Sequence, residues 1–197
     1  MIKFGKRVNY RPLIISLVLG LFPGLIFAMV GFGKIPSILV GIGIFLVFFV
    51  GYYFRILPVL FNYWEVGNGY VQYINLNKTS ARFKALLLPF SVHMKTIDFN
   101  SIKSATIKGD LSKLEQEPMA IPYSGYLAVI TAVLSIIHNP VDITFELTDG
   151  TSITVGAARD MVYGKDKAIK KLEKMLNQMS DAKIQVIDQT DHKVKLV

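Results

Sequence analysis

Few residues of this 197-residue chain have the types and spacing that catalysis or metal binding needs. The histidines His93, His138 and His192 lie far apart, and none has a carboxylate or a second histidine at metal-ligand spacing. The absence of cysteine excludes disulfide scaffolds, thiolate metal sites and cysteine nucleophiles. Phosphate-cradling glycine loops, dinucleotide fingerprints and Gly-x-Ser-x-Gly elbows are absent too. The sequence therefore predicts no metal and no cofactor.

Three acidic residues, Asp142, Glu146 and Asp149, come closest to a paired-carboxylate site. Their spacing fits the exposed face and the turn of a β-hairpin better than it fits a general acid and a general base. We therefore expect a protein without catalytic activity. An enzyme of an unfamiliar kind is the alternative.

A short basic segment, residues 77–84, is the best candidate for contact with anionic head groups. Its cations Lys78, Arg82 and Lys84 are interleaved with hydroxyl side chains and with Phe83. Near an anionic membrane surface each such cation contributes about 1 kcal/mol. We predict that these three cations contact lipid head groups; the alternative is a solvated loop without a ligand.

The elements that must position these residues begin with two apolar runs. No charge occurs from Pro12 to Gly33, and Lys34 is the only charge before Arg55. As helices, residues 12–33 and 35–56 each reach about 30 Å, the thickness of the hydrocarbon layer. The sequence therefore predicts a transmembrane helical hairpin within residues 1–62. A secretory signal peptide is the competing interpretation, but the second apolar run argues against it.

Small residues recur every four positions in both predicted spans. They are Gly20, Gly24 and Ala28 in the first span and Ser37 and Gly41 in the second. Small side chains at this spacing let helix backbones approach closely in a membrane. We predict that they pack the hairpin; the alternative is a face that binds another membrane protein.

The formal net charge of +8 would ordinarily suggest a nucleic-acid partner. However, residues 1–64 hold six Lys and Arg and no acid, whereas residues 65–197 hold sixteen bases against fourteen acids. The bases of the first part flank the spans, and only Lys34 lies between them. The positive-inside rule therefore places both termini in the cytoplasm. We expect a multi-pass protein of the cell membrane whose partner is the lipid bilayer, with no nucleic acid.

After residue 62 the pattern changes to short alternating runs that are typical of strands. Two hairpins are indicated by the turn residues Gly67-Asn68-Gly69 and Asp149-Gly150. The predicted strands are residues 63–66, 70–74, 85–94, 102–108, 141–148 and 151–155.

A helix is predicted to follow from Asp166, since Ile169, Leu172, Leu176 and Met179 form one apolar stripe. Strands followed by a helix indicate an α+β domain. We place that domain at residues 63–180 and a C-terminal tail at residues 181–197.

This order of elements resembles a bacterial pleckstrin-homology-like (PH-like) domain. The resemblance rests on the hairpin strands, on Ile-Asp-Phe-Asn-Ser-Ile-Lys-Ser at residues 97–104, on the Asp149-Gly150 hairpin and on the terminal helix. The whole chain is similar to bacterial membrane proteins that join two N-terminal spans to such a domain. The resemblance implies a roll-like antiparallel sheet closed by a C-terminal helix, with a binding role in place of catalysis. It carries over no site residue.

One apolar insertion, residues 118–140, departs from that pattern because it contains no charged side chain. Its core, residues 126–137, would span about 18 Å as a helix, too short to cross a membrane. The large residues Leu127, Ile130, Leu134 and Ile137 share one face of such a helix. We predict that this face docks on the membrane; buried strands and a third membrane segment are the alternatives.

Together these patterns predict a non-catalytic, membrane-anchored binding, scaffold or accessory protein. Its cytoplasmic domain is expected to contact lipid head groups or a protein partner, and another membrane protein is the expected partner. No small-molecule substrate is indicated. The alternative is a small immunity or transporter-associated subunit that acts through its transmembrane helices.

Overall fold

The computed structural model describes residues 1–109 and 134–190. The chain forms two compact units, each assembled from separate stretches of sequence. Unit 1 comprises Met1–Lys6, Val59–Ile74 and Met94–Val197, and unit 2 comprises Arg7–Pro58 and Asn75–His93. The sequence-based division at residue 62 differs from this grouping, because the first six residues belong to unit 1 and residues 75–93 to unit 2.

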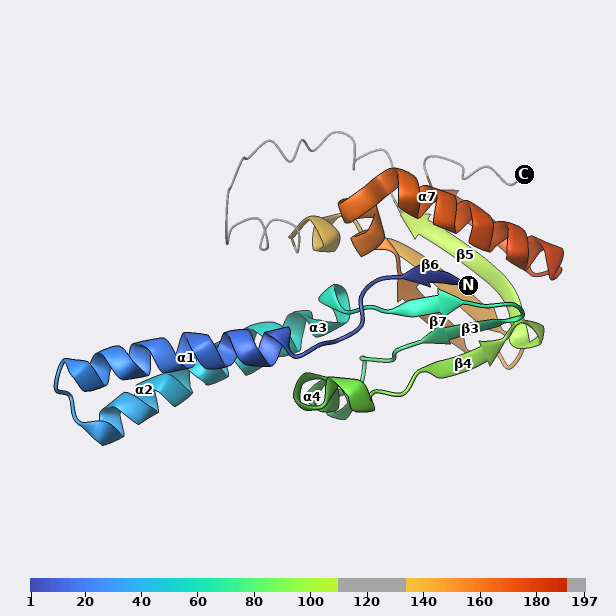
Figure 1. Cartoon of the computed structure of the whole chain (residues 1–197). Helices are drawn as coiled ribbons and strands as arrows, with labels where there is room; N and C mark the ends of the chain where they lie inside the picture. Colours follow the sequence, from blue (N-terminus) through green and yellow to red (C-terminus); the bar gives the residue numbers. More distant parts are fainter. Residues whose placement is uncertain (110–133, 191–197) are drawn as a thin grey trace. The chain divides into compact units, whose positions relative to one another are not determined.

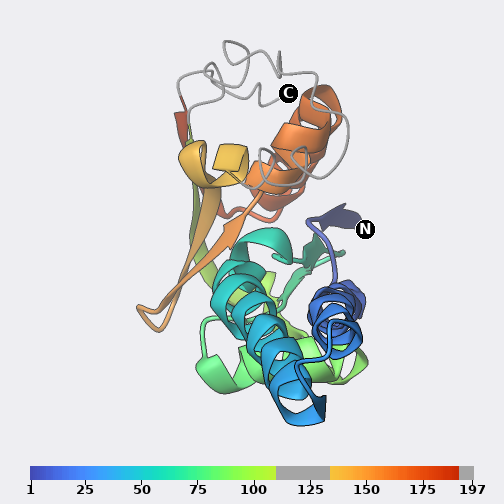
Figure 2. The same ribbon diagram turned by 90° about the vertical axis from the view of Figure 1, so that its left-hand side faces the viewer.

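Unit 2 contains an antiparallel helical hairpin, which Figure 2 shows from its connecting turn. Its first helix is α1 (Arg11–Met29). The second runs without a break through α2 (Lys34–Leu46), the π-helix η1 (Val47–Tyr53) and α3 (Phe54–Leu60). Both helices are long and apolar enough to span a membrane.

Unit 2 also contains α4 (Thr79–Leu87) and the 3-10 turn η2 (Pro89–Ser91). The prediction of a strand at residues 85–94 is therefore wrong, and residues 79–84 are helical instead of a loop. Ala85 and Leu86 are buried while Phe83 and Leu87 are exposed, which is a helical and not an alternating period. A short apolar run does not by itself distinguish these two periods.

Unit 1 contains two four-stranded sheets (Figure 1). The first is antiparallel, in the order β1-β2-β3-β4. Its strands are β1 (Ile2–Phe4), β2 (Trp64–Val66), β3 (Tyr70–Tyr73) and β4 (Lys95–Asp98). The predicted hairpin at residues 67–69 is confirmed, and Gly69 takes the positive φ of 87° that its turn requires.

The second sheet is mixed, in the order β7-β6-β5-β8, and η3 (Phe99–Ser101) leads into it. Its strands are β5 (Ile102–Gly109), β6 (Val141–Leu147), β7 (Ser152–Gly156) and β8 (Gln185–Thr190). The Asp149-Gly150 hairpin is confirmed: Asp149 accepts hydrogen bonds from the N–H and hydroxyl of Thr151 at 2.8 and 2.7 Å. Strand β8 lies in the segment expected as a tail and pairs in parallel with β5.

Helix α7 (Ala158–Asp181) closes the core of unit 1. It begins earlier than the predicted Asp166, and Gly164, with φ −178° and ψ 73°, interrupts it. Leu172, Leu176 and Met179 of the predicted stripe are fully buried. The core that they join contains side chains from both sheets, among them Trp64, which stacks on Phe4 at 4.1 Å between ring centroids. An α+β domain after two apolar helices is thus confirmed.

Candidate functional site

The most distinctive surface of unit 2 lies where its two long helices begin and end. We call this end, where α1 starts and α3 stops, the hairpin base. Helix α4 packs beside it (Figure 1). Phe90 contacts Tyr10, just before α1, with ring centroids 5.4 Å apart, and Phe83 contacts Phe54, the first residue of α3, at 4.5 Å. The hairpin base also carries Arg11 and Arg55, the basic residues that flank the apolar runs.

Four large apolar side chains on α4, on η2 and on the residue between them are exposed, and we call them the α4 patch. They are Phe83, Leu87, Leu88 and Phe90, with 40, 50, 57 and 84% of their surface accessible. Phe83 and Leu87 are four residues apart and so share a face of the helix. Ala85, on the opposite side of α4, and Leu86, beside Phe83, are buried. Part of the apolar surface of α4 therefore packs on protein, and the part at Phe83 and Leu87 does not.

The three predicted head-group cations lie on or directly before α4. Lys78 and Lys84 are exposed, and neither forms an ion pair within the described part of the chain. Arg82 is half-buried: its Nε donates to the Leu76 carbonyl at 2.7 Å, and its guanidinium lies 5.7 Å from the Phe54 ring centroid. Lys78 and Lys84 are therefore free to contact a ligand, whereas Arg82 also holds α4 in place.

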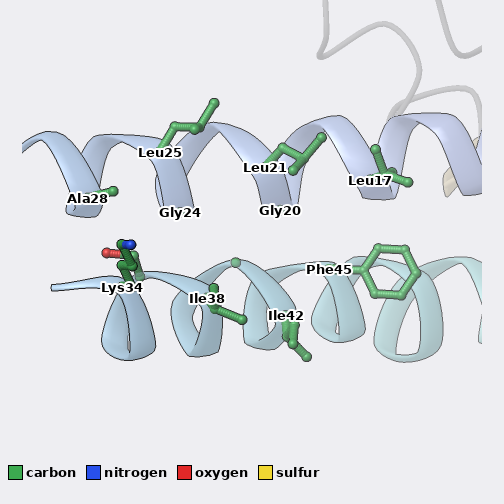
Figure 3. A pocket seen from close by; sticks show the side chains of 12 residues that line it. Leu17, Gly20, Leu21, Gly24, Leu25, Ala28, Lys34, Ile38, Ile42 and Phe45 are labelled. Carbon is green, nitrogen blue, oxygen red and sulfur yellow. The ribbon is translucent and has the colours of Figure 1, made fainter.

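The five predicted helix-packing residues meet along one side of the hairpin. Gly20, Gly24, Ala28, Ser37 and Gly41 all line an apolar groove of about 530 Å³ between α1 and α2 (Figure 3). A Cβ added to Gly20 would lie 2.6 Å from the Gly41 carbonyl oxygen. The two backbones thus touch where these small residues face one another. We call this feature the hairpin groove.

The predicted membrane-docking face lies partly outside the described residues. This applies to Leu127 and Ile130, whereas Leu134 and Ile137 lie in a helical stretch at residues 134–138. Both are 48% exposed, while Ile136 between them belongs to the core of unit 1.

The acidic residues of the β6–β7 hairpin have separate roles. Glu146 accepts a hydrogen bond from the Ser104 hydroxyl at 2.9 Å. Burial raises the pKa of Asp142, whereas the hydrogen bonds from Thr151 lower the pKa of Asp149. Within residues 1–109 and 134–190, no three His, Asp or Glu side chains are grouped as a metal site would need.

Comparisons with protein families, curated proteins and solved structures find no match.

The sequence singles out the three cations beside the α4 patch but does not indicate Leu87, Leu88 and Phe90 as exposed residues of that patch. The spacing of Phe83 and Leu87 was the available signal, but it was hidden in a run of apolar residues that also fits a strand.

Proposed function

We propose that this protein is a non-catalytic binding or scaffold protein, anchored in a bacterial cell membrane by its helical hairpin. The α4 patch carries the proposal, because it places exposed apolar side chains beside unpaired cations at the hairpin base. In this arrangement α4 lies in the head-group region of the cytoplasmic leaflet. Both termini and unit 1 lie in the cytoplasm, as the distribution of basic residues indicates.

The physical chemistry of the interface supports this placement of α4. Aromatic rings are enriched where membrane and water meet, and Phe83 and Phe90 would lie at that depth. An amphipathic helix in the interface buries its apolar face among the acyl chains. Lys78 and Lys84 would then lie among lipid phosphates, where each contributes about 1 kcal/mol in an anionic leaflet. Soluble surfaces seldom expose a continuous apolar patch of this kind without a partner.

For unit 1 we infer a PH-like roll with a binding role. Two four-stranded sheets enclosing one core, with a helix across it, support that inference. Its additions to the expected roll are β1 at the start of the chain and β8 after the helix. A protein partner of this unit, such as another membrane protein, fits a scaffold or accessory role.

The depth of α4 can be measured directly because the chain has no native cysteine. Spin labels at Leu87→Cys and Phe90→Cys, in the full chain reconstituted into vesicles with anionic lipid, should be more accessible to oxygen than to a polar nickel complex. Oxygen concentrates among acyl chains, whereas the nickel complex stays in water.

A label at Ser152→Cys provides the control, since Ser152 is an exposed polar residue of unit 1. It should show the reverse preference. If the labels at residues 87 and 90 are as accessible to the nickel complex as the label at residue 152, α4 does not lie in the membrane.

The hairpin groove favours a second candidate function, that of a transporter-associated or immunity subunit acting through its spans. The groove offers an apolar, small-residue surface of the kind against which membrane helices pack. Replacing the hairpin by an unrelated one distinguishes the two functions: a scaffold acting through unit 1 keeps its cellular activity, and a span-dependent subunit loses it.

A further inference from the structure

Unit 1 contains a cavity that the membrane-contact proposal does not use. It has a volume of about 220 Å³ and lies along α7, next to the loop that follows β1. Its lining includes the side chains Arg159, Asp160, Tyr163, Lys167 and Lys171. Three of these five side chains are cationic and one is anionic. We call it the α7 pocket.

The spacing of residues on α7 creates the pocket. Asp160, Gly164, Lys167 and Lys171 all line one side of α7, although the helix is interrupted at Gly164. Gly164 leaves the middle of that side empty, since a Cβ there would meet no atom within 4 Å. The open space at Gly164 is therefore flanked by the cations Arg159 and Lys167.

Asp160 and Lys171 are already engaged with each other and with the protein. Lys171 Nζ lies 2.8 Å from Asp160 Oδ1, and the Gly5 N–H donates to Asp160 Oδ2 at 2.5 Å. The Lys171 ammonium also lies 5.5 Å from the centroid of the Phe4 ring. This ion pair therefore holds the N-terminal strand against α7 and is close to neutral.

Arg159 and Lys167 are differently placed. Within the described residues neither forms an ion pair. Arg159 donates one N–H to the Leu60 carbonyl at 3.1 Å and lies over the Tyr163 ring at 4.8 Å, which fixes its guanidinium at the pocket. Among residues 1–109 and 134–190, no acid is ion-paired with the Arg159 guanidinium or with the Lys167 ammonium. The pocket thus presents two uncompensated positive charges, one of them held in place.

We propose that the α7 pocket binds a small phosphate-bearing ligand through Arg159 and Lys167. Phosphate oxygens accept charge-assisted hydrogen bonds from guanidinium and ammonium groups, and the planar guanidinium matches their geometry. The volume is below the roughly 300–1,000 Å³ of pockets for larger ligands, so it suits a phosphate and a short attached group. The phosphate belongs either to a soluble phosphomonoester or to a lipid head group. This inference goes beyond the proposed membrane contact of α4 and depends on different residues.

Equilibrium dialysis of the full chain in a non-ionic detergent against radiolabelled glycerol 3-phosphate tests the proposal. Lys167→Gln removes one charge-assisted hydrogen bond and should weaken binding by about tenfold. Lys174→Gln makes the same change of charge on an exposed α7 residue that does not line the pocket, and it should bind as the native chain does.

A variant that gains affinity guards against a loss caused by misfolding. Asp160→Asn removes the negative charge of the pocket but keeps an oxygen to accept the Gly5 N–H, so it should bind glycerol 3-phosphate more tightly. The absence of saturable binding by the native chain would overturn the proposal, as would equal weakening by Lys167→Gln and Lys174→Gln or unchanged affinity of Asp160→Asn.

The source of the phosphate is distinguished in nanodiscs. The native chain is compared in discs containing phosphatidic acid and in discs of matched surface charge containing phosphatidylglycerol. Weaker binding of glycerol 3-phosphate in the phosphatidic acid discs indicates that a lipid phosphomonoester occupies the pocket, and equal binding indicates a soluble ligand. Either result supports a phosphate site, and neither depends on where the spin labels of α4 lie.

Discussion

Gly20 determines how closely the two helices of the hairpin approach. In Gly20→Ala the new Cβ would lie 2.6 Å from the Gly41 carbonyl oxygen and 2.9 Å from the Cβ of Phe45, so the helices must move apart. Overpacking of this kind costs about 1–3 kcal/mol. We expect that loss in the free energy of unfolding, measured by titrating the reconstituted chain with a denaturing detergent.

Gly43→Ala is the matched control, because a Cβ at Gly43 meets no atom within 4 Å. It should leave the free energy of unfolding unchanged or raise it slightly, since alanine favours the helix. Equal losses in the two variants would show that the contact at Gly20 does not hold the hairpin together.

Two aspartates of the β6–β7 hairpin should affect the pH dependence of stability in opposite directions. Burial raises the pKa of Asp142 above its ordinary 3.8, so the charged form of this side chain opposes folding. The free energy of unfolding therefore falls as the pH rises from 3.8 through the raised pKa of the folded protein. Asp142→Asn should therefore stabilise the protein at neutral pH, by no more than about 1 kcal/mol because solvent reaches the group. The gain should vanish as pH falls to 3.8.

Asp149 provides the comparison of opposite sign. Hydrogen bonds from Thr151 lower its pKa, so its charge favours folding and the benefit is lost as pH falls through the lowered pKa. Asp149→Asn should therefore destabilise the protein at neutral pH. Denaturant unfolding followed by the fluorescence of Trp64, the single tryptophan, measures both variants. The same sign for both would contradict these assignments.

Among the elements, we expect the three-residue strand β1 to contribute more to the free energy of unfolding of unit 1 than its length suggests. Phe4 is fully buried and stacks on Trp64, so Phe4→Ala should cost about 3–5 kcal/mol. Trp64 fluorescence during denaturation reports this loss directly. Lys3→Ala, in the same strand but exposed, should change stability by less than about 0.5 kcal/mol. A small effect of Phe4→Ala would mean that β1 is dispensable.

The elements that the sequence predicted correctly carry strong local signals. The two long helices of the hairpin are apolar runs, the two β-hairpins have glycine turns, and α7 has an apolar stripe. Strands β1 and β8 have weak signals, since each is short and is fixed by pairing with a distant strand. The sequence does not predict helix α4, because its short apolar run fits the period of a strand as well as that of a helix. Only the burial of Ala85 and Leu86 shows the helical period.

Local signals also determine which residues of the candidate sites the sequence can group together. Lys78, Arg82 and Lys84 are neighbours in sequence, so the sequence groups them, and their contact with head groups stays a prediction. The α7 pocket brings Gly5 to Asp160, and no local pattern links residues so far apart.

For the whole molecule, we propose that the hairpin spans the membrane and that unit 1 lies in the cytoplasm. The claim depends on the basic residues that flank both spans and on the single cation, Lys34, at the turn. A chain inserted the other way would expose unit 1 and the hairpin base outside the cell. The contacts that we propose between α4 and head groups would then lie in the outer leaflet.

Cysteine accessibility in bacterial spheroplasts tests this claim most directly. Phe32→Cys lies in the exposed turn between the spans and Ser152→Cys on the exposed surface of unit 1. With a membrane-impermeant maleimide, we predict that residue 32 reacts in intact spheroplasts and that residue 152 reacts only after permeabilisation. Reaction of residue 152 in intact spheroplasts, with residue 32 protected, would mean that unit 1 lies outside the cell.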